Sequence, residues 1–111
     1  MKIAVVGSRD FTDYERLCRT LDALEFDLLI SGGARGADKL AERYADERGI
    51  KKHIYYAEWG KLGKKAGIMR NEDIVKNSDM IVAFWDGKSR GTNHTIQFAQ
   101  TLGKPVIIKR F

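Results

Sequence analysis

Short apolar runs alternate along this chain with longer segments in which apolar residues recur every three or four positions. The runs have the length of β-strands and are rich in valine, isoleucine and aromatic residues. They cover residues 2–7, 27–32, 53–57, 79–85 and 104–109. Because the runs are almost continuously apolar, we expect strands that are buried on both faces, as in a parallel sheet.

The segments between the runs have the periodicity of amphipathic helices. We expect these helices over about residues 14–24, 37–49, 64–76 and 92–102. Thr12 and Glu15 have the form of a capping box at the start of the first helix, and Gly49 is placed to end the second. The stretch 58–63, which contains Trp59, is predicted to be irregular, either a packed crossover or a loop that covers a ligand.

Five strands and four helices therefore alternate along the sequence. Parallel strands joined by helical crossovers are the economical way to bury such a pattern. We expect an α/β fold, a single Rossmann-like three-layer sandwich whose five-stranded parallel sheet has the order 3-2-1-4-5. A chain of 111 residues has room for one hydrophobic core and is too short for two, so residues 1–111 are predicted to form one domain.

Composition and charge narrow the class of partner only slightly. Hydrophobic residues make up 43% of the chain, and no apolar run approaches the roughly 20 residues that cross a bilayer, so we expect no membrane association. The net charge of +5 favours anionic partners, although the basic residues are spread widely enough to form an ordinary solvated surface. A single cysteine, Cys18, fits a reducing compartment and predicts a cytoplasmic protein. No cluster of residues in the sequence resembles a metal site.

Three loops are predicted to meet at one edge of the sheet. Because parallel strands point the same way, the loops that follow them gather at their carboxyl ends, where open α/β sheets bind ligands. GSRD at 7–10, GGARGAD at 32–38 and DGKSRGTNHT at 86–95 follow the first, second and fourth strands. Each loop leads into a helix whose first N–H groups attract anions, and glycine lets the backbone approach a phosphate. For each loop taken singly, glycines that serve turn geometry alone are the plainer interpretation.

These loops supply the residues predicted to bind a phosphate-bearing ligand, because backbone amides, hydroxyl groups and arginine side chains are the groups that hold phosphate. The candidates are Gly7, Ser8, Arg9, Ser31, Gly32, Gly33, Arg35, Gly36, Asp38, Gly87, Ser89, Arg90, Gly91 and Thr92. Neither glycine loop has a lysine followed by serine or threonine after its last glycine, and the first strand is not followed by G-x-G-x-x-G. An ordinary ATPase and an ordinary nicotinamide dehydrogenase are therefore excluded.

Four longer motifs give the chain a resemblance to a known family. They are VVGSRDF at 5–11, SGGARGADKLAERYA at 31–45, EWGKLGKKAGIMRN at 58–71 and AFWDGKSRGTNHTI at 83–96. In this order, and over nearly all of the chain, they resemble the YspA-type branch of the SLOG superfamily, formerly a domain of unknown function. The resemblance implies a Rossmann-like fold whose glycine-rich loops bind nucleotides or nucleotide-derived ligands. The superfamily includes cytokinin-activating phosphoribohydrolases and a DNA-processing protein that loads single strands.

The resemblance to the phosphoribohydrolases indicates which residues could bind a ligand or take part in catalysis. Those enzymes carry an Arg-Lys pair before the fourth strand. Arg70 and Asn71 stand at that place here, so the resemblance adds both to the predicted ligand-binding residues. The glycine loop of those enzymes ends in a glutamate, whereas Thr95 stands there in this chain and cannot supply a charge for splitting an N-glycosidic bond. The candidate catalytic residues are Arg70, Asp86 and His94.

Three functions are compatible with these residues. The first is a binding module that captures a phosphate-bearing nucleotide or nucleotide-derived small molecule as a sensor, carrier or sequestering agent, which fits the missing glutamate best. The second is a nucleotide hydrolase of the phosphoribohydrolase type, in which Asp10, Asp38 or Asp86 replaces the usual acid. The third and least favoured is single-stranded nucleic acid binding through the positive charge and Trp59 beside Lys61. We expect no cofactor and, by analogy with relatives, a homo-oligomer.

Overall fold

The computed structural model describes all 111 residues, and its five strands form one parallel sheet. The strands are β1 Lys2–Gly7, β2 Leu28–Ser31, β3 Lys51–Ile54, β4 Met80–Trp85 and β5 Val106–Arg110. Their order is β3-β2-β1-β4-β5, and every neighbouring pair is parallel. The predicted α/β fold and strand order are therefore confirmed. The order reverses between β1 and β4, so the predicted binding edge lies at the carboxyl ends of these two strands.

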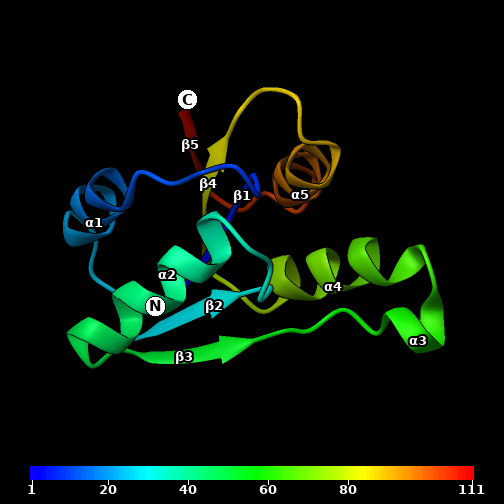
Figure 1. Ribbon diagram of the computed structural model, residues 1–111, viewed down its shortest axis with the longest axis horizontal. Coiled ribbons are helices and arrows are strands. Elements are labelled where there is room, and N and C mark those ends of the chain that lie inside the picture. The colour runs from blue at the N-terminus through cyan, green and yellow to red at the C-terminus, as the bar shows by residue number, and fades with distance from the viewer.

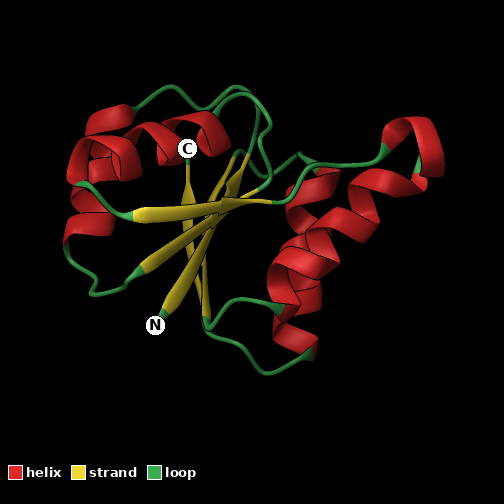
Figure 2. Cartoon of the chain, turned by 90° about the horizontal axis from the view of Figure 1, so that it is seen from below, coloured by secondary structure: helices red, strands yellow, loops and turns green.

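Helices cover both faces of the sheet. They are α1 Tyr14–Asp22, α2 Ala37–Arg48, α3 Trp59–Leu62, α4 Lys65–Lys76 and α5 Arg90–Thr101. α1 and α2 pack on one face and α4 and α5 on the other, so the sheet is the middle of three layers (Figures 1 and 2). Gly49 ends α2 in the left-handed conformation, with φ 66°, as the sequence predicts.

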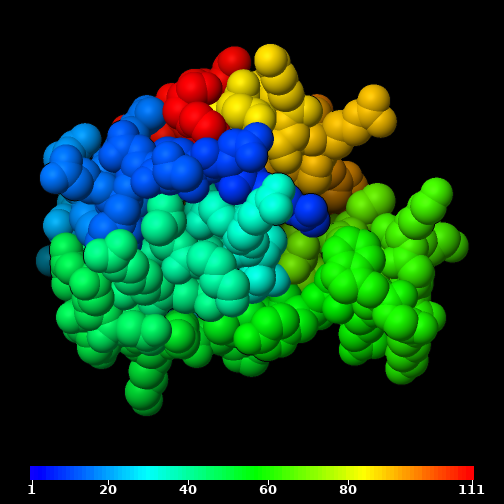
Figure 3. Space-filling view, in the orientation of Figure 1, coloured from blue at the N-terminus to red at the C-terminus, as the bar shows by residue number.

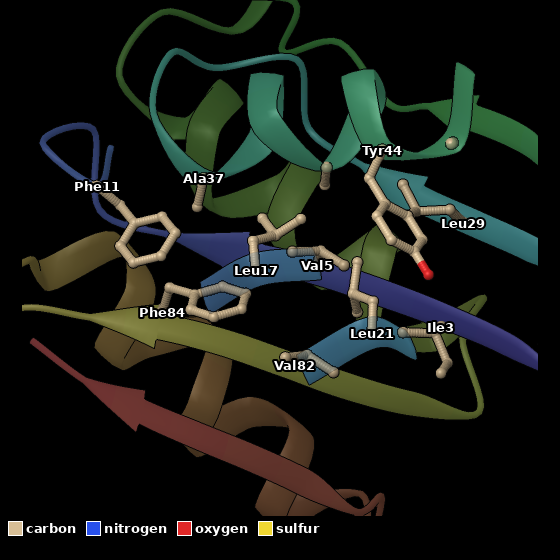
Figure 4. Close-up of a cluster of buried hydrophobic side chains, with 12 residues drawn as sticks. Ile3, Val5, Phe11, Leu17, Leu21, Leu29, Ala37, Tyr44, Val82 and Phe84 are labelled. Carbon is tan, nitrogen blue, oxygen red and sulfur yellow. The ribbon is translucent and has the colours of Figure 1, made fainter. Parts of the chain in front are cut away.

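Alternation along β1 divides the hydrophobic core into two clusters. Ile3 and Val5 belong to the cluster beneath α1 and α2, which Figure 4 shows with Phe84 of β4. Ala4 and Val6 point to the opposite face and belong to the cluster beneath α4 and α5. Because successive side chains of a strand face opposite sides, a central strand that is buried on both faces is apolar throughout.

Phe11 anchors the loop that follows β1. Its ring is 2% exposed and stacks on Phe84 with the ring centroids 4.6 Å apart, and the Phe11 N–H donates to the Ser8 carbonyl. This packing fixes the loop that carries Arg9 at the edge of the sheet. Phe11 is therefore a core residue rather than a surface on which a ligand stacks.

Three local predictions were wrong. β3 lies at 51–54 instead of 53–57, and most of its residues are exposed because it is an edge strand that pairs only with β2. The cap of α1 is Asp13, whose Oδ1 accepts the Arg16 N–H at 3.1 Å, and not Thr12. The stretch 58–63 contains the short helix α3, which is not irregular.

α3 and the start of α4 extend away from the sheet, as Figures 1 and 2 show. A Cβ on Gly67 would lie 3.0 Å from Cη2 of Trp59, so the glycine lets the indole lie close against α4. Ile68 and Met69 of α4 are 50% and 45% exposed, and α4 therefore presents apolar side chains to solvent. None of the helices has the length and apolar character that crossing a bilayer requires.

Candidate ligand-binding site

The three glycine-bearing loops come together at the carboxyl ends of β1, β2 and β4. They surround a first hollow of about 280 Å³, visible in Figure 3 between the loop after β1, the loop before α2 and the start of α5. Eight of the predicted residues line it, namely Gly7, Arg9, Asp38, Arg70, Asn71, Ser89, Gly91 and Thr92. Val6, Ala34, Ile74 and Thr95 complete the lining. The walls are mainly polar, which suits a polar ligand.

A second hollow of about 360 Å³ adjoins the first and shares Arg9, Ala34 and Arg70 with it. Its other lining residues are Gly32, Gly33, Arg35, Tyr56, Ala57 and Trp59. A third hollow of about 290 Å³ lies beyond Tyr56 and is bordered by Lys61. Arg70 borders all three hollows and is therefore the central side chain of the cleft.

The N-terminus of α5 faces the first hollow. Ser89 caps this helix, and its Oγ accepts the Thr92 N–H at 3.4 Å. The N–H groups of Arg90 and Gly91 have no acceptor within the chain. Gly91 has no side chain to cover these groups, because a Cβ there would meet only Asn71 Nδ2, at 3.8 Å. Unpaired N–H groups at the positive end of a helix attract anions, and here they are accessible.

The glycine loop before α2 differs from the start of α5. The Gly33 N–H donates to Ser31 Oγ at 3.3 Å, and the Ala34 N–H donates to Asp38 Oδ2 at 3.1 Å. Gly36 has φ 82°, and a Cβ on it would lie 2.5 Å from the carbonyl oxygens of the loop after β1. The Gly33 and Ala34 amides are therefore engaged by the protein itself, and Gly36 serves the close packing of two loops.

Arg70 is fixed in the cleft by hydrogen bonds. Its Nη1 donates to the Gly32 carbonyl, and its Nε donates to Asn71 Oδ1 at 2.9 Å. Burial lowers the pKa of the Arg70 guanidinium, and the neighbouring Arg9 lowers it further, whereas Asp38 raises it. Arg9 is exposed and lines the same two hollows, so two guanidinium groups lie at the boundary between them.

Asp38 is the buried acid of the site. It is 6% exposed, and burial raises the pKa of its carboxyl to about 6, against the opposing effects of the Ala34 hydrogen bond and of Arg70. A Cβ on Gly32 would lie 2.9 Å from both Asp38 Oδ2 and Arg70 Nη1, so a side chain from α2 and one from α4 converge on this glycine. A carboxylate in this position accepts hydrogen bonds from a ligand.

Two of the three serines among the predicted residues, Ser8 and Ser31, lie outside the hollows, whereas Ser89 lines the first. Ser8 is buried, and its Oγ accepts the Asp86 N–H at 3.2 Å. Ser31 is also buried, and its Oγ lies 3.2 Å from Glu42 Oε2. Both hydroxyls therefore join loops and helices of the protein to one another and do not face a ligand.

Several other predicted residues also lie outside the hollows. Gly87 has φ 82° in a turn packed against the Arg110 side chain, and Arg90 is exposed next to Gly91 without lining the cleft. Asp86 accepts the N–H groups of Lys88 and Ser89, both at 2.8 Å, which lower the pKa of its carboxyl. The His94 ring lies 3.1 Å from Glu72 Oε2. Asp86 and His94, two of the three candidate catalytic residues, therefore have partners outside the cleft.

Several residues at or beside the site were not predicted, and Glu42 and Tyr56 are two of them. Glu42 is 7% exposed and bonds to Ser31, beside Asp38 on the buried face of α2. Its spacing of four from Asp38 puts two carboxylates on the apolar side of one helix, a signal that the sequence does contain. Tyr56, which is 68% exposed, follows β3, and no pattern separates it from a core tyrosine.

Two solved structures share the fold. DNA processing protein A from Streptococcus pneumoniae aligns with a TM-score of 0.77 and 20% identity over 96% of this chain and 49% of its own. DNA processing protein A from Helicobacter pylori, described with its single-stranded DNA binding mode, aligns with a TM-score of 0.77 and 22% identity over 97% of this chain and 64% of its own. The chain spans less than two thirds of either protein, and at these identities the likeness shows the fold alone.

Sequence comparison reaches further. The gene 61 protein of Mycobacterium phage D29 is 35% identical over 117 residues, which cover 96% of this chain and 94% of the phage protein. The model of the family described as YspA, cpYpsA-related SLOG matches residues 1–61, which include the loops after β1 and β2. With a match over more than half of its length and a relative that is similar along almost all of it, this chain belongs to the YspA, cpYpsA-related SLOG family.

Proposed function

We propose that this domain binds a phosphate-bearing nucleotide or nucleotide-derived small molecule in the first hollow, and serves as a sensor, carrier or sequestering module. The observation that carries the proposal is that Gly91, whose N–H and that of the preceding Arg90 are free, lines the first hollow together with Arg9 and Arg70. Helix N-termini and guanidinium groups both attract anions, and their convergence favours a phosphate over a neutral ligand.

The phosphate is expected at Gly91 and not at the glycine loop before α2. At Gly91 the N–H is free and no side chain covers it, whereas the Gly33 and Ala34 N–H groups already have acceptors. A phosphate bound to the Ala34 N–H would have to displace the Asp38 carboxylate. The start of α5 requires no such rearrangement.

The base of a nucleotide is expected in the second hollow. Tyr56 and Trp59 line it and are 68% and 54% exposed. Aromatic side chains that are accessible at the wall of a cleft stack on bases, at a typical gain of about 1–3 kcal/mol per base. A ligand whose phosphate lies at α5 reaches these rings by passing Arg70.

The proposal is tested by titrating the protein with nucleoside 5′-monophosphates in a calorimeter and by mass spectrometry of any small molecule that co-purifies. Arg9→Ala is expected to weaken binding about tenfold or more, because Arg9 is exposed and available to a ligand. Arg19→Ala removes the same charge from the exposed face of α1 and serves as the control. Equal losses in both variants, or no binding by the native protein, would refute the proposal.

Single-stranded nucleic acid is the second candidate ligand. The three hollows adjoin one another around Arg70, and Lys61 and Arg35 border them, so a cationic track with two exposed aromatic rings runs from α5 toward α3. The fold likeness to DNA processing protein A is consistent with this candidate. A strand that follows the track contacts several phosphates, so its affinity falls steeply with salt, whereas that of a mononucleotide falls gently.

A nucleotide hydrolase has less support. Thr95 stands where the phosphoribohydrolases carry glutamate, and its Oγ1 donates to the Gly91 carbonyl at 2.9 Å. Of the aspartates considered for the acid, Asp38 lines the first hollow and Asp86 does not. Release of free base from a panel of nucleotides, abolished by Arg70→Ala, would establish the hydrolase and set aside a pure binding role.

We also propose that residues 1–111 act as one domain that forms a homo-oligomer and works in the cytoplasm. The exposed Ile68 and Met69 of α4 support association, because they leave apolar surface that a second copy of the chain could cover. The lone Cys18, which is unpaired, is compatible with a reducing compartment.

A further inference from the structure

Asp38 has a carboxylate oxygen that the chain leaves free. The residue is 6% exposed, lies in the first turn of α2 and lines the first hollow. Its Oδ2 accepts the Ala34 N–H at 3.1 Å and the Gly32 N–H also approaches the carboxyl, whereas none of the hydrogen bonds within the chain ends on Oδ1. No fully buried side-chain nitrogen or oxygen of this protein lacks a partner, so Oδ1 keeps some exposure, and the hollow that Asp38 lines is the open space beside it.

Charged groups from three elements face this carboxylate. Arg70 reaches toward it from α4, Arg9 lines the same hollow from the loop after β1, and Glu42 lies one turn further along α2. None of the ion pairs of the protein includes Asp38. The carboxylate is therefore buried near cations without being neutralised by one of them.

The structural role of Asp38 does not require its charge. Holding the Ala34 N–H needs only a neutral acceptor oxygen, which asparagine supplies without the cost of burying a carboxylate. A carboxylate beside an anion site also repels the phosphate. Both costs are offset when Oδ1 accepts a hydrogen bond from the ligand, because bonds to charged acceptors are about twice as strong as those to neutral ones.

The position of Asp38 indicates which group of the ligand donates this hydrogen bond. Asp38 and Gly91 line the first hollow and not the second, whereas Tyr56 and Trp59 line the second and not the first. In a nucleoside 5′-phosphate the sugar lies between phosphate and base, and its hydroxyls are hydrogen-bond donors. The sugar is thus expected in the first hollow, beside the carboxylate.

We propose that Asp38 Oδ1 accepts a hydroxyl of the ligand's ribose, and that the cleft therefore selects ribonucleotides over their deoxy counterparts. The inference rests on the proposed function and adds a sugar specificity to it. It also separates the two candidate ligands, because a ribose-selective cleft disfavours a DNA strand.

The test compares affinities of the full chain at neutral pH for the four ribonucleoside 5′-monophosphates and their 2′-deoxy and 3′-deoxy counterparts. Removal of the recognised hydroxyl is expected to weaken binding about 10- to 100-fold, the usual worth of a hydrogen bond to a charged group. Asp38→Asn is expected to bind ribonucleotide and deoxyribonucleotide within about threefold of each other. Asp46→Asn, an exposed site on the same helix, is the control and should keep the preference.

Each outcome decides the matter. Equal affinity of the native protein for the ribo form and both deoxy forms overturns the sugar specificity and leaves nucleotide binding standing. A preference that survives in Asp38→Asn overturns the role of this residue. Failure of every nucleotide to bind overturns the proposed function together with this inference. If Asp38→Asn does not fold, the deoxy series on the native chain still decides whether a hydroxyl is recognised.

Discussion

Replacing Gly91 by leucine is expected to stabilise the protein and to abolish ligand binding. Gly91 lies in the first turn of α5 with a negative φ, and a Cβ there would meet only Asn71 Nδ2, at 3.8 Å. Leucine is preferred to glycine in a helix by up to about 1 kcal/mol. Near the helix end we expect a gain of about 0.5 kcal/mol in the free energy of unfolding, which raises Tm by about 2–4 °C.

Binding is expected to change in the opposite direction. The leucine side chain enters a hollow of about 280 Å³ at the place where the phosphate is expected, and it covers the free N–H groups of Arg90 and Gly91. Loss of two hydrogen bonds to an anion corresponds to a decrease in affinity of about 100-fold or more. A variant that is more stable yet does not bind separates a blocked site from a damaged fold.

Urea unfolding and calorimetric titration with nucleoside 5′-monophosphates measure the two effects on the same samples. Gly60→Leu is the matched control, because Gly60 also lies in a helix, a Cβ on it meets nothing within 4 Å, and it lines none of the three hollows. It should bind like the native protein. Undiminished binding by Gly91→Leu, or an equal loss in Gly60→Leu, would show that the ligand does not bind at the start of α5.

Three further predictions concern stability and assembly. The pKa of the Asp38 carboxyl is raised from 3.8 to about 6, so between these values the folded state keeps a proton that the unfolded chain releases. The free energy of unfolding should therefore fall by about 3 kcal/mol as pH rises from about 4 to above 6. Urea denaturation should show no such contribution in Asp38→Asn, and an unchanged pH profile would contradict the assignment. Lys104 Nζ donates to the carbonyls of Val75 at 2.7 Å and Ser78 at 2.6 Å at the end of α4. Lys104→Met should therefore lower the free energy of unfolding, measured by urea denaturation, by about 2 kcal/mol. Lys88→Met, at an exposed position, should leave it almost unchanged. Light scattering should find particles of at least twice the 12.6 kDa of one chain, and Met69→Glu should dissociate them; single chains in the native sample would disprove association through α4.

The architecture follows from the sequence because its signals are periodic and repeated. Ile3 to Val6 face both layers in alternation, and such a strand is apolar at every position wherever helices cover both sides. The edge strand β3 lacks this signal. Its residues pair with only one neighbour and lie mostly exposed, so Lys51 and Lys52 carry no apolar mark, and the apolar residues that follow were mistaken for the strand.

The position of the candidate site could be predicted from the sequence, whereas the groups that are free to bind a ligand there could be predicted only in part. Strand order alone brings Gly7, the loop before α2 and Gly91 to one edge. Which amides are free depends on hydrogen bonds that only coordinates show, and Asp38 occupies the Ala34 N–H in a loop that looks in sequence like a phosphate cradle. Asp38 and Glu42 both face the core of the protein, and their spacing of four residues along α2 is visible in the sequence.

The proposed function requires that an anion binds to the free amides at the start of α5. The most direct measurement is an NMR titration of the protein, labelled with ¹⁵N, with a nucleoside 5′-monophosphate and separately with inorganic phosphate. We expect the Arg90 and Gly91 amide signals to shift most with both ligands, while the Gly33 and Ala34 amides, which already have acceptors, shift little with phosphate alone. Shifts centred on Gly33 and Ala34 with phosphate, or spread evenly over the basic surface, would contradict this expectation.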